Sequence, residues 1–171
     1  AMWLSGVAVA PATLAPTLLV AGTSVSASGV ATDITGIPSW ARRVTVLFDT
    51  LSVNGSSSLL VQIGDSGGIE TTGYTGGGSI IAASTAATTA YTTGFGLRTT
   101  ASIDVISGAL VLTRISGNLW VASGTFGFQN TAATGVAGGS KALSDALTQV
   151  RITTVGGSDT FDSGSINVVY E

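Results

Sequence analysis

The chain has 171 residues, of which 44% are hydrophobic and only 9% are charged. Six Lys and Arg residues against nine Asp and Glu residues give a net charge of −3, so no basic surface can neutralise phosphates, and nucleic acid is not expected as a partner. The absence of Cys and His removes the thiol nucleophile, the imidazole base and the usual zinc ligands. We therefore expect a protein that is not an enzyme, with no catalytic residues, no metal site and no cofactor.

The N-terminal residues differ in composition from the rest of the chain. Residues 3–21 are apolar, but they lack the basic start of a signal peptide, and prolines interrupt them before they reach the roughly 18 apolar residues that a membrane-spanning helix needs. We expect no membrane insertion and interpret residues 1–29 as an extended lead-in segment that packs on the domain or on a neighbouring chain. Ala1-Met2 is interpreted as a cloning scar, and one domain is expected over residues 30–171.

The first two predicted strands flank a strong turn signal. Residues 44–53 and 58–63 are rich in β-branched and aliphatic side chains. Asn54-Gly55 lies between them, and this dipeptide is typical of the two-residue turns that join antiparallel strands. The pattern predicts that these strands form one antiparallel pair.

Further short strands follow along the chain. They are predicted at residues 103–106, 110–115, 119–125, 150–154 and 166–170. The segment Ser116-Gly117-Asn118 is the predicted turn of a hairpin. Short strands with Gly-rich turns, and no alternation of strands with helices, are typical of sandwiches and barrels. The expected fold is all-β, an antiparallel β-sandwich with a jelly-roll-like topology.

Three stretches are too irregular to predict strands, residues 22–39, 64–79 and 129–141. We interpret the glycine-rich residues 64–79 as a long exposed loop, because loops on a rigid sandwich often carry function. Residues 141–147 show a helix signal sufficient for one or two turns.

The segment Gly64-Asp65-Ser66-Gly67-Gly68 matches the nucleophile segment of trypsin-like serine proteases. That chemistry needs a general base for the seryl proton, and the chain has no His. Nothing in the sequence places the single lysine, Lys141, near Ser66. We interpret the segment as a glycine-rich turn that follows a strand.

Two loops carry pairs of carboxylates, Asp65 with Glu70 and Asp159 with Asp162. Glycoside hydrolysis needs two carboxyl groups that face a sugar, and a calcium site needs about six to eight oxygen ligands. Neither spacing meets these requirements. We expect Asp159 and Asp162 to form side-chain hydrogen bonds to turn backbone.

Aromatic side chains mark the candidate ligand-binding positions, because an aromatic ring with polar neighbours suits a sugar. Tyr74 is the aromatic residue of the glycine-rich loop, close in sequence to Asp65 and Glu70, and Tyr91 lies in a Thr- and Ala-rich stretch. We therefore select Tyr74, Tyr91, Asp65 and Glu70 as candidate ligand-binding residues. Trp40 is expected to close one end of the core.

Several segments carry a resemblance to a known family. They are Gly36-Ile37-Pro38-Ser39-Trp40-Ala41-Arg42-Arg43-Val44-Thr45-Val46, Leu59-Leu60-Val61-Gln62-Ile63-Gly64 with Thr72-Gly73-Tyr74, Gly117-Asn118-Leu119-Trp120-Val121-Ala122-Ser123-Gly124, and the closing run from Gly139-Ser140-Lys141 to Glu171. Over residues 30–171 the chain resembles a C-terminal domain family of tailed-bacteriophage virion proteins, which are tail-fibre-like.

The resemblance implies a structural protein of the extracellular phage particle, made in the bacterial cytoplasm. It implies a homotrimer that contacts other virion proteins, and a receptor-binding role toward a host-surface carbohydrate is the expected function. The alternative is a passive head-decoration or baseplate module without a host ligand. The family supplies no catalytic residues, and a depolymerase is disfavoured by the small size and the lack of an acid/base pair.

Overall fold

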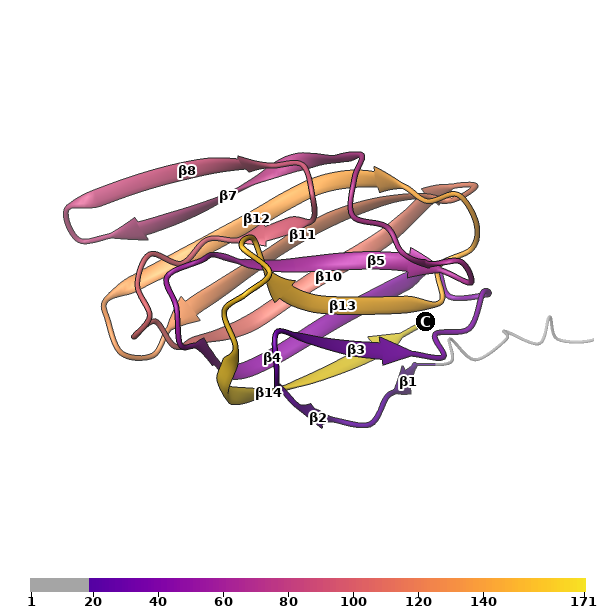
Figure 1. Ribbon diagram of the computed structural model, residues 1–171. Coiled ribbons are helices and arrows are strands. Elements are labelled where there is room, and N and C mark those ends of the chain that lie inside the picture. Colours follow the sequence, from indigo (N-terminus) through magenta and orange to yellow (C-terminus); the bar gives the residue numbers. More distant parts are fainter. Residues whose placement is uncertain (1–18) are drawn as a thin grey trace, which may run out of the picture.

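Two antiparallel sheets, packed face to face, make up residues 19–171, the part of the chain that the computed structural model describes (Figure 1). In sheet order the larger, nine-stranded sheet consists of β1 (Val20–Ala21), β14 (Phe161–Tyr170), β4 (Arg43–Val53), β10 (Ile106–Ser116), β11 (Leu119–Phe128), β12 (Ala133–Ala142), β7 (Tyr74–Ala82) and β8 (Thr85–Tyr91), with β2 (Val25–Ser26) also paired to β14. The smaller, five-stranded sheet consists of β3 (Ala31–Thr35), β13 (Gln149–Thr154), β5 (Leu59–Asp65) and β6 (Gly68–Ile69), with β9 (Phe95–Leu97) also paired to β5. The predicted all-β sandwich is confirmed at this level.

Alternating side chains build the core between the sheets. In β4, Val44, Val46 and Phe48 are buried, whereas Leu47 and Asp49 are exposed, as expected when successive residues of a strand point to opposite faces. In the smaller sheet, β5 is buried along its whole length. The sandwich therefore has one apolar interior, and the outer face of β5 is covered as well.

The predicted hairpin over residues 110–125 is confirmed. β10 and β11 pair antiparallel, with Leu112 opposite Ala122 and Ser116 opposite Leu119. Gly117 takes a φ of 51°, a left-handed conformation that favours glycine, and this lets the chain reverse within two residues.

The predicted pairing of residues 44–53 with residues 58–63 is wrong. β4 belongs to the larger sheet and β5 to the smaller one, so the chain crosses between sheets at Asn54-Gly55. Asn54 instead binds the loop that precedes β14: its backbone N–H donates to Thr160 O at 3.0 Å, and its Oδ1 accepts from Thr160 N at 2.9 Å. The turn signal is real, but its partner is a distant loop.

The three stretches expected to be irregular contain strands. β2 and β3 lie within residues 22–39, β6 and most of β7 within 64–79, and most of β12 within 129–141. β7 and β12 pair along their length with glycines facing each other, and a Cβ on Gly76 would lie 2.3 Å from the carbonyl oxygen of Gly138. The glycines that suggested a loop therefore allow two backbones to pack closely.

Three smaller expectations are also wrong. Residues 141–147 form the end of β12 followed by a bend and irregular chain, with no helical turn. The strand expected at 103–106 begins only at Ile106. Trp40 does not close the core, because it is 48% exposed and packs edge-on against Tyr170 with ring centroids 5.7 Å apart.

Part of the expected lead-in segment pairs with the C-terminal strand. Val20–Ala21 and Val25–Ser26 form the antiparallel strands β1 and β2 against β14. Ala1-Met2 and the rest of the lead-in up to residue 18 lie outside the described residues. Across residues 19–171 no helix has the length and apolar character needed to cross a bilayer.

Candidate functional site

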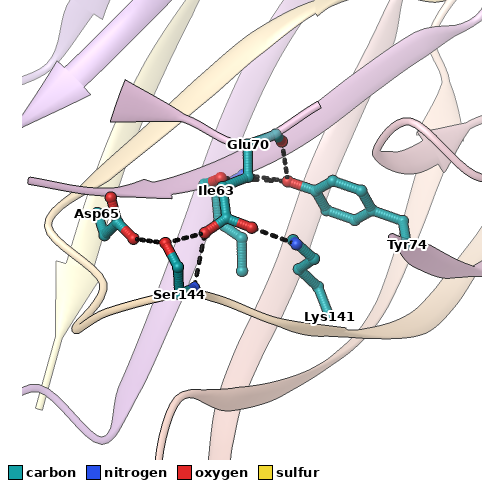
Figure 2. Close-up of polar contacts among 6 residues, drawn as sticks. All are labelled: Ile63, Asp65, Glu70, Tyr74, Lys141 and Ser144. Atoms are coloured by element: carbon teal, nitrogen blue, oxygen red, sulfur yellow. Dashed lines mark hydrogen bonds and ion pairs between the residues drawn. The ribbon is translucent and has the colours of Figure 1, made fainter. Parts of the chain in front are cut away.

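Five polar side chains from distant parts of the sequence meet at one end of the sandwich (Figure 2). They are Asp65, Glu70, Tyr74, Lys141 and Ser144, and we call them the Tyr74 cluster. Asp65 ends β5, Glu70 follows β6 and Tyr74 opens β7, while Lys141 and Ser144 come from the end of β12 and the loop after it. The pairing of β7 with β12 places Tyr74 opposite Lys141 and so fixes the centre of the cluster.

The Tyr74 hydroxyl fills a gap in the smaller sheet. β9 pairs with β5 up to Val61, and β6 pairs with β5 from Gly64 onward. The carbonyl of the intervening Ile63 accepts from Glu70 N at 3.1 Å, whereas no strand of the described chain accepts from its backbone N–H on this side. The backbone N–H of Ile63 donates to the Tyr74 hydroxyl at 2.8 Å, and that hydroxyl lies 2.8 Å from Glu70 O and 3.2 Å from Ile63 O, either of which can accept its proton. The hydroxyl thus replaces a missing backbone acceptor, because a buried backbone donor needs a partner.

The Tyr74 ring is buried, with 2% of its surface exposed, and packs edge-on against Phe95 with centroids 5.1 Å apart. Burial, together with the negative charge of Glu70, raises the pKa of the Tyr74 hydroxyl to about 12, although the bond from Ile63 opposes this. The phenol is therefore protonated at neutral pH.

Lys141 and Glu70 form an ion pair inside the cluster. The ammonium group of Lys141 hydrogen-bonds to Glu70 Oε2 and lies 5.5 Å from the centroid of the Tyr74 ring, a cation–π distance. Only 6% of Lys141 is exposed, against 24% of Glu70. Burial acts to raise the pKa of Glu70, but the hydrogen bonds from Lys141 and Ser144 outweigh it, and the pKa lies below its ordinary value.

Ser144 joins the two carboxylates. Its hydroxyl lies 2.6 Å from Asp65 Oδ2 and 2.9 Å from Glu70 Oε1, and its backbone N–H donates to the same Glu70 oxygen at 2.7 Å. Asp65 also accepts a bond from Gly67 N at 2.7 Å. The bond from Ser144, followed by that from Gly67, holds the pKa of Asp65 below its ordinary value. Both carboxylates are therefore ionised at neutral pH and are already occupied by donors of the protein.

The arrangement is suited to holding chain segments together rather than to bond-breaking chemistry. Neither carboxylate has a raised pKa, as a general acid would need, and the lysine is paired. Ser66 is exposed in the turn between β5 and β6 and forms no hydrogen bond to Lys141 in the described chain. Within residues 19–171, no group of three or more metal-ligating side chains comes together.

The structure brings together three of the four predicted ligand-binding residues, Asp65, Glu70 and Tyr74, but it buries the aromatic ring. Tyr91, the fourth, is also buried and lies at the end of β8, outside the cluster. Its ring packs on the backbone of Gly96, where a Cβ would lie 2.1 Å from a ring carbon. Neither tyrosine offers a ring face to solvent.

Lys141 and Ser144 are the members of the cluster that sequence reasoning missed. A single lysine in a chain with so few charges was the available signal, because a cation in apolar surroundings needs a carboxylate partner. Asp159 forms the expected side-chain bond to backbone, but in a distant turn, since its Oδ2 accepts from Ser57 N at 3.0 Å. Asp162 lies in β14 and makes no side-chain hydrogen bond within residues 19–171, so the expectation for it is wrong.

Comparison with models of protein families, with curated proteins and with solved structures finds no match to this chain. No family membership is therefore shown.

Proposed function

We propose that this chain is a structural domain of a tailed-bacteriophage particle, located in a tail fibre or another receptor-binding part, that attaches to a glycan on the host surface. The proposal starts from the sequence resemblance. It also includes the jelly-roll-like topology, assembly as a homotrimer and contact with other virion proteins.

The segments that carry the resemblance occupy the middle of the fold. Residues 36–46 lead into β4, residues 59–64 form most of β5, and residues 117–124 form the tip of the hairpin and the first part of β11. The closing run contains β13 and β14, which pair with β5 and β4, respectively. The resemblance thus concerns the framework of both sheets and not an isolated stretch.

One observation carries the proposal furthest. Thr72-Gly73-Tyr74 and Gly139-Ser140-Lys141 belong to separate segments of the resemblance, and their last residues are partners in the β7–β12 pair, with the Lys141 ammonium 5.5 Å from the centroid of the Tyr74 ring. The ion pair of the same lysine with Glu70 ties the segment that follows β6 to the larger sheet. Such cross-linking supports a domain that presents a rigid surface, because a pre-ordered surface loses less entropy on binding.

The topology supports the jelly-roll-like part of the proposal. The chain crosses from the larger to the smaller sheet between β4 and β5, and it crosses again between β12, β13 and β14. Strands from its two ends pair, since β1 and β2 both lie against β14.

The passive structural module remains the second candidate, and burial of the selected residues favours it. Tyr74 and Tyr91 are only 2% and 6% exposed, so neither is an open platform for a sugar. A passive module would bind a partner protein of the particle and no cell surface.

Binding of the fluorescently labelled chain to bacterial cells tests the proposal. We expect it to adhere to strains sensitive to the phage that encodes it and not to derivatives selected for resistance. Adhesion to neither, combined with incorporation of the labelled chain into phage particles, would reject the attachment role in favour of the passive one. Release of reducing sugar from host polysaccharide would contradict both.

A further inference from the structure

A groove of about 510 Å³ runs over the outer face of the smaller sheet, away from the core, and this volume lies within the roughly 300–1,000 Å³ typical of small-molecule sites. Its floor comes from β5 and β13, and its walls come from the loops at residues 71–72, 93 and 155–157 and from residues 30–31. The groove does not include any residue of the Tyr74 cluster.

Two side chains of β5 form the floor. Leu60 and Gln62 alternate with the core residues of the strand and so point outward, yet they are only 1% and 6% exposed. Gln62 Nε2 donates to Thr93 O at 2.7 Å, whereas Oε1 accepts no hydrogen bond from the described residues. Tyr91, Arg98 and Trp120 hold the fully buried side-chain atoms that lack a partner among the described residues, so the Gln62 oxygen reaches the groove and is available to a ligand donor.

The walls carry threonine hydroxyl groups, and the groove lining has no unpaired charge. Thr71, Thr72 and Thr93 are exposed, and their hydroxyls make no hydrogen bond within residues 19–171. The one charged lining residue, Arg151, forms a two-point ion pair with Asp33 at 2.6 and 2.7 Å. The groove therefore has donors and acceptors but no unpaired ion.

We propose that this groove binds a neutral oligosaccharide. Threonine hydroxyls both donate and accept, as sugar hydroxyls do, and the Gln62 oxygen adds an acceptor. The half-exposed Val155 gives apolar surface for the C–H face of a sugar ring. Lack of a free charge favours a neutral sugar over an acidic one, because an acidic sugar would have to be desolvated without a cation.

The Tyr74 cluster supports one wall of this groove. Glu70 precedes Thr71 directly and is held by Lys141 and Ser144, and Tyr74 follows two residues after Thr72. The two threonines are thereby fixed at both ends. This inference rests on the proposed attachment function and places its ligand in the groove instead of at the two tyrosines.

The test uses the full chain and an immobilised panel of neutral oligosaccharides of glucose, galactose and N-acetylglucosamine, with uronic acid oligosaccharides and extended peptides as the other arms. The variant Thr71→Val/Thr72→Val removes two wall hydroxyls. Thr113→Val/Thr125→Val is the matched control, since both threonines are exposed on the larger sheet and make no side-chain hydrogen bond in the described residues.

We expect the wild-type chain to bind at least one neutral oligosaccharide, the groove variant to bind it at least tenfold more weakly, and the control to bind it unchanged. Equal loss in both variants, no loss in the groove variant, or preference for the acidic sugars or peptides would overturn the inference. Adhesion to cells without binding of any neutral oligosaccharide would overturn the groove assignment and leave the attachment function standing. Absence of both would reject the two together.

Discussion

Two buried tyrosines, Tyr74 and Tyr91, show how differently the two neighbouring strands β7 and β8 use the same side chain. The Tyr74 hydroxyl accepts from Ile63 N and has two carbonyl oxygens within reach, so it completes the smaller sheet. The Tyr91 hydroxyl is buried and has no hydrogen-bond partner within residues 19–171, while its ring packs on Gly96. The first tyrosine contributes through its oxygen and the second through its ring.

Burial alone does not determine whether a polar side chain stabilises the fold. A buried hydroxyl with partners stabilises the fold, and one without partners carries a desolvation cost. Substitutions at the two tyrosines and their neighbours separate these two cases.

Replacing Lys141 by Met should destabilise the fold more than any other substitution in the Tyr74 cluster considered below. The change keeps an unbranched apolar side chain but leaves the Glu70 carboxylate without its cation, which should lower the free energy of unfolding by about 3 kcal/mol. Urea unfolding followed by tryptophan fluorescence measures it. The double variant Lys141→Met/Glu70→Gln removes the unpaired charge and should recover most of the loss; a double variant no more stable than the single one would contradict this account.

Tyr74→Phe should destabilise the fold by about 2 kcal/mol, because it leaves the Ile63 N–H buried without an acceptor. The ring and its contact with Phe95 stay in place, so the effect isolates the oxygen. The same urea titration gives the number. A change within about 0.5 kcal/mol of zero, the range of an ordinary surface substitution, would show that the hydroxyl does not complete the sheet.

Acid should weaken the Tyr74 cluster in a graded way. The folded-state pKa values of Asp65 and Glu70 lie below their ordinary values near 4, so the folded state binds fewer protons than the unfolded state. The stabilisation is complete above that range and is lost as the pH falls through it. Unfolding midpoints measured between pH 7 and pH 3 should therefore decrease toward acid, and Glu70→Gln should flatten the decrease. An equal decrease in both proteins would exclude Glu70 as its source.

Tyr91→Phe should have the smallest effect, with the opposite sign. Removing a buried hydroxyl that has no partner relieves its desolvation cost and should stabilise the fold by up to about 1 kcal/mol. Thermal unfolding measured next to Tyr74→Phe gives the sharpest comparison, since the two variants differ only in position. A loss of stability as large as that of Tyr74→Phe would remove the distinction between the two tyrosines.

The sequence predicts the sandwich and the hairpin at residues 110–125, because alternation and local turn chemistry are properties of neighbouring residues. It mispairs β4 and β5, because the choice of sheet depends on the remote contact of Asn54 with Thr160. It also misses β7 and β12, where glycines permit close packing that only the partner strand reveals.

The candidate site was predictable only in part, because only some of its residues are neighbours in the sequence. Asp65, Glu70 and Tyr74 lie within ten residues of one another and could be grouped by sequence. Lys141 and Ser144 enter through the pairing of β7 with β12, which no local pattern encodes. The burial of both tyrosines likewise follows from neighbours brought in by the fold, Phe95 and Gly96.

Ile63 donates its backbone hydrogen bond to a side chain, whereas Val61 and Asp65 in the same strand pair with other strands. The Ile63 amide is therefore an internal reporter. Local opening governs how fast a backbone amide exchanges its proton with deuterium. At Ile63 that opening requires Tyr74 to move, whereas the flanking amides respond to separation of the strands. The exchange rate of this one proton, read by NMR beside those of Val61 and Asp65, therefore follows the state of the Tyr74 cluster without a label or a mutation.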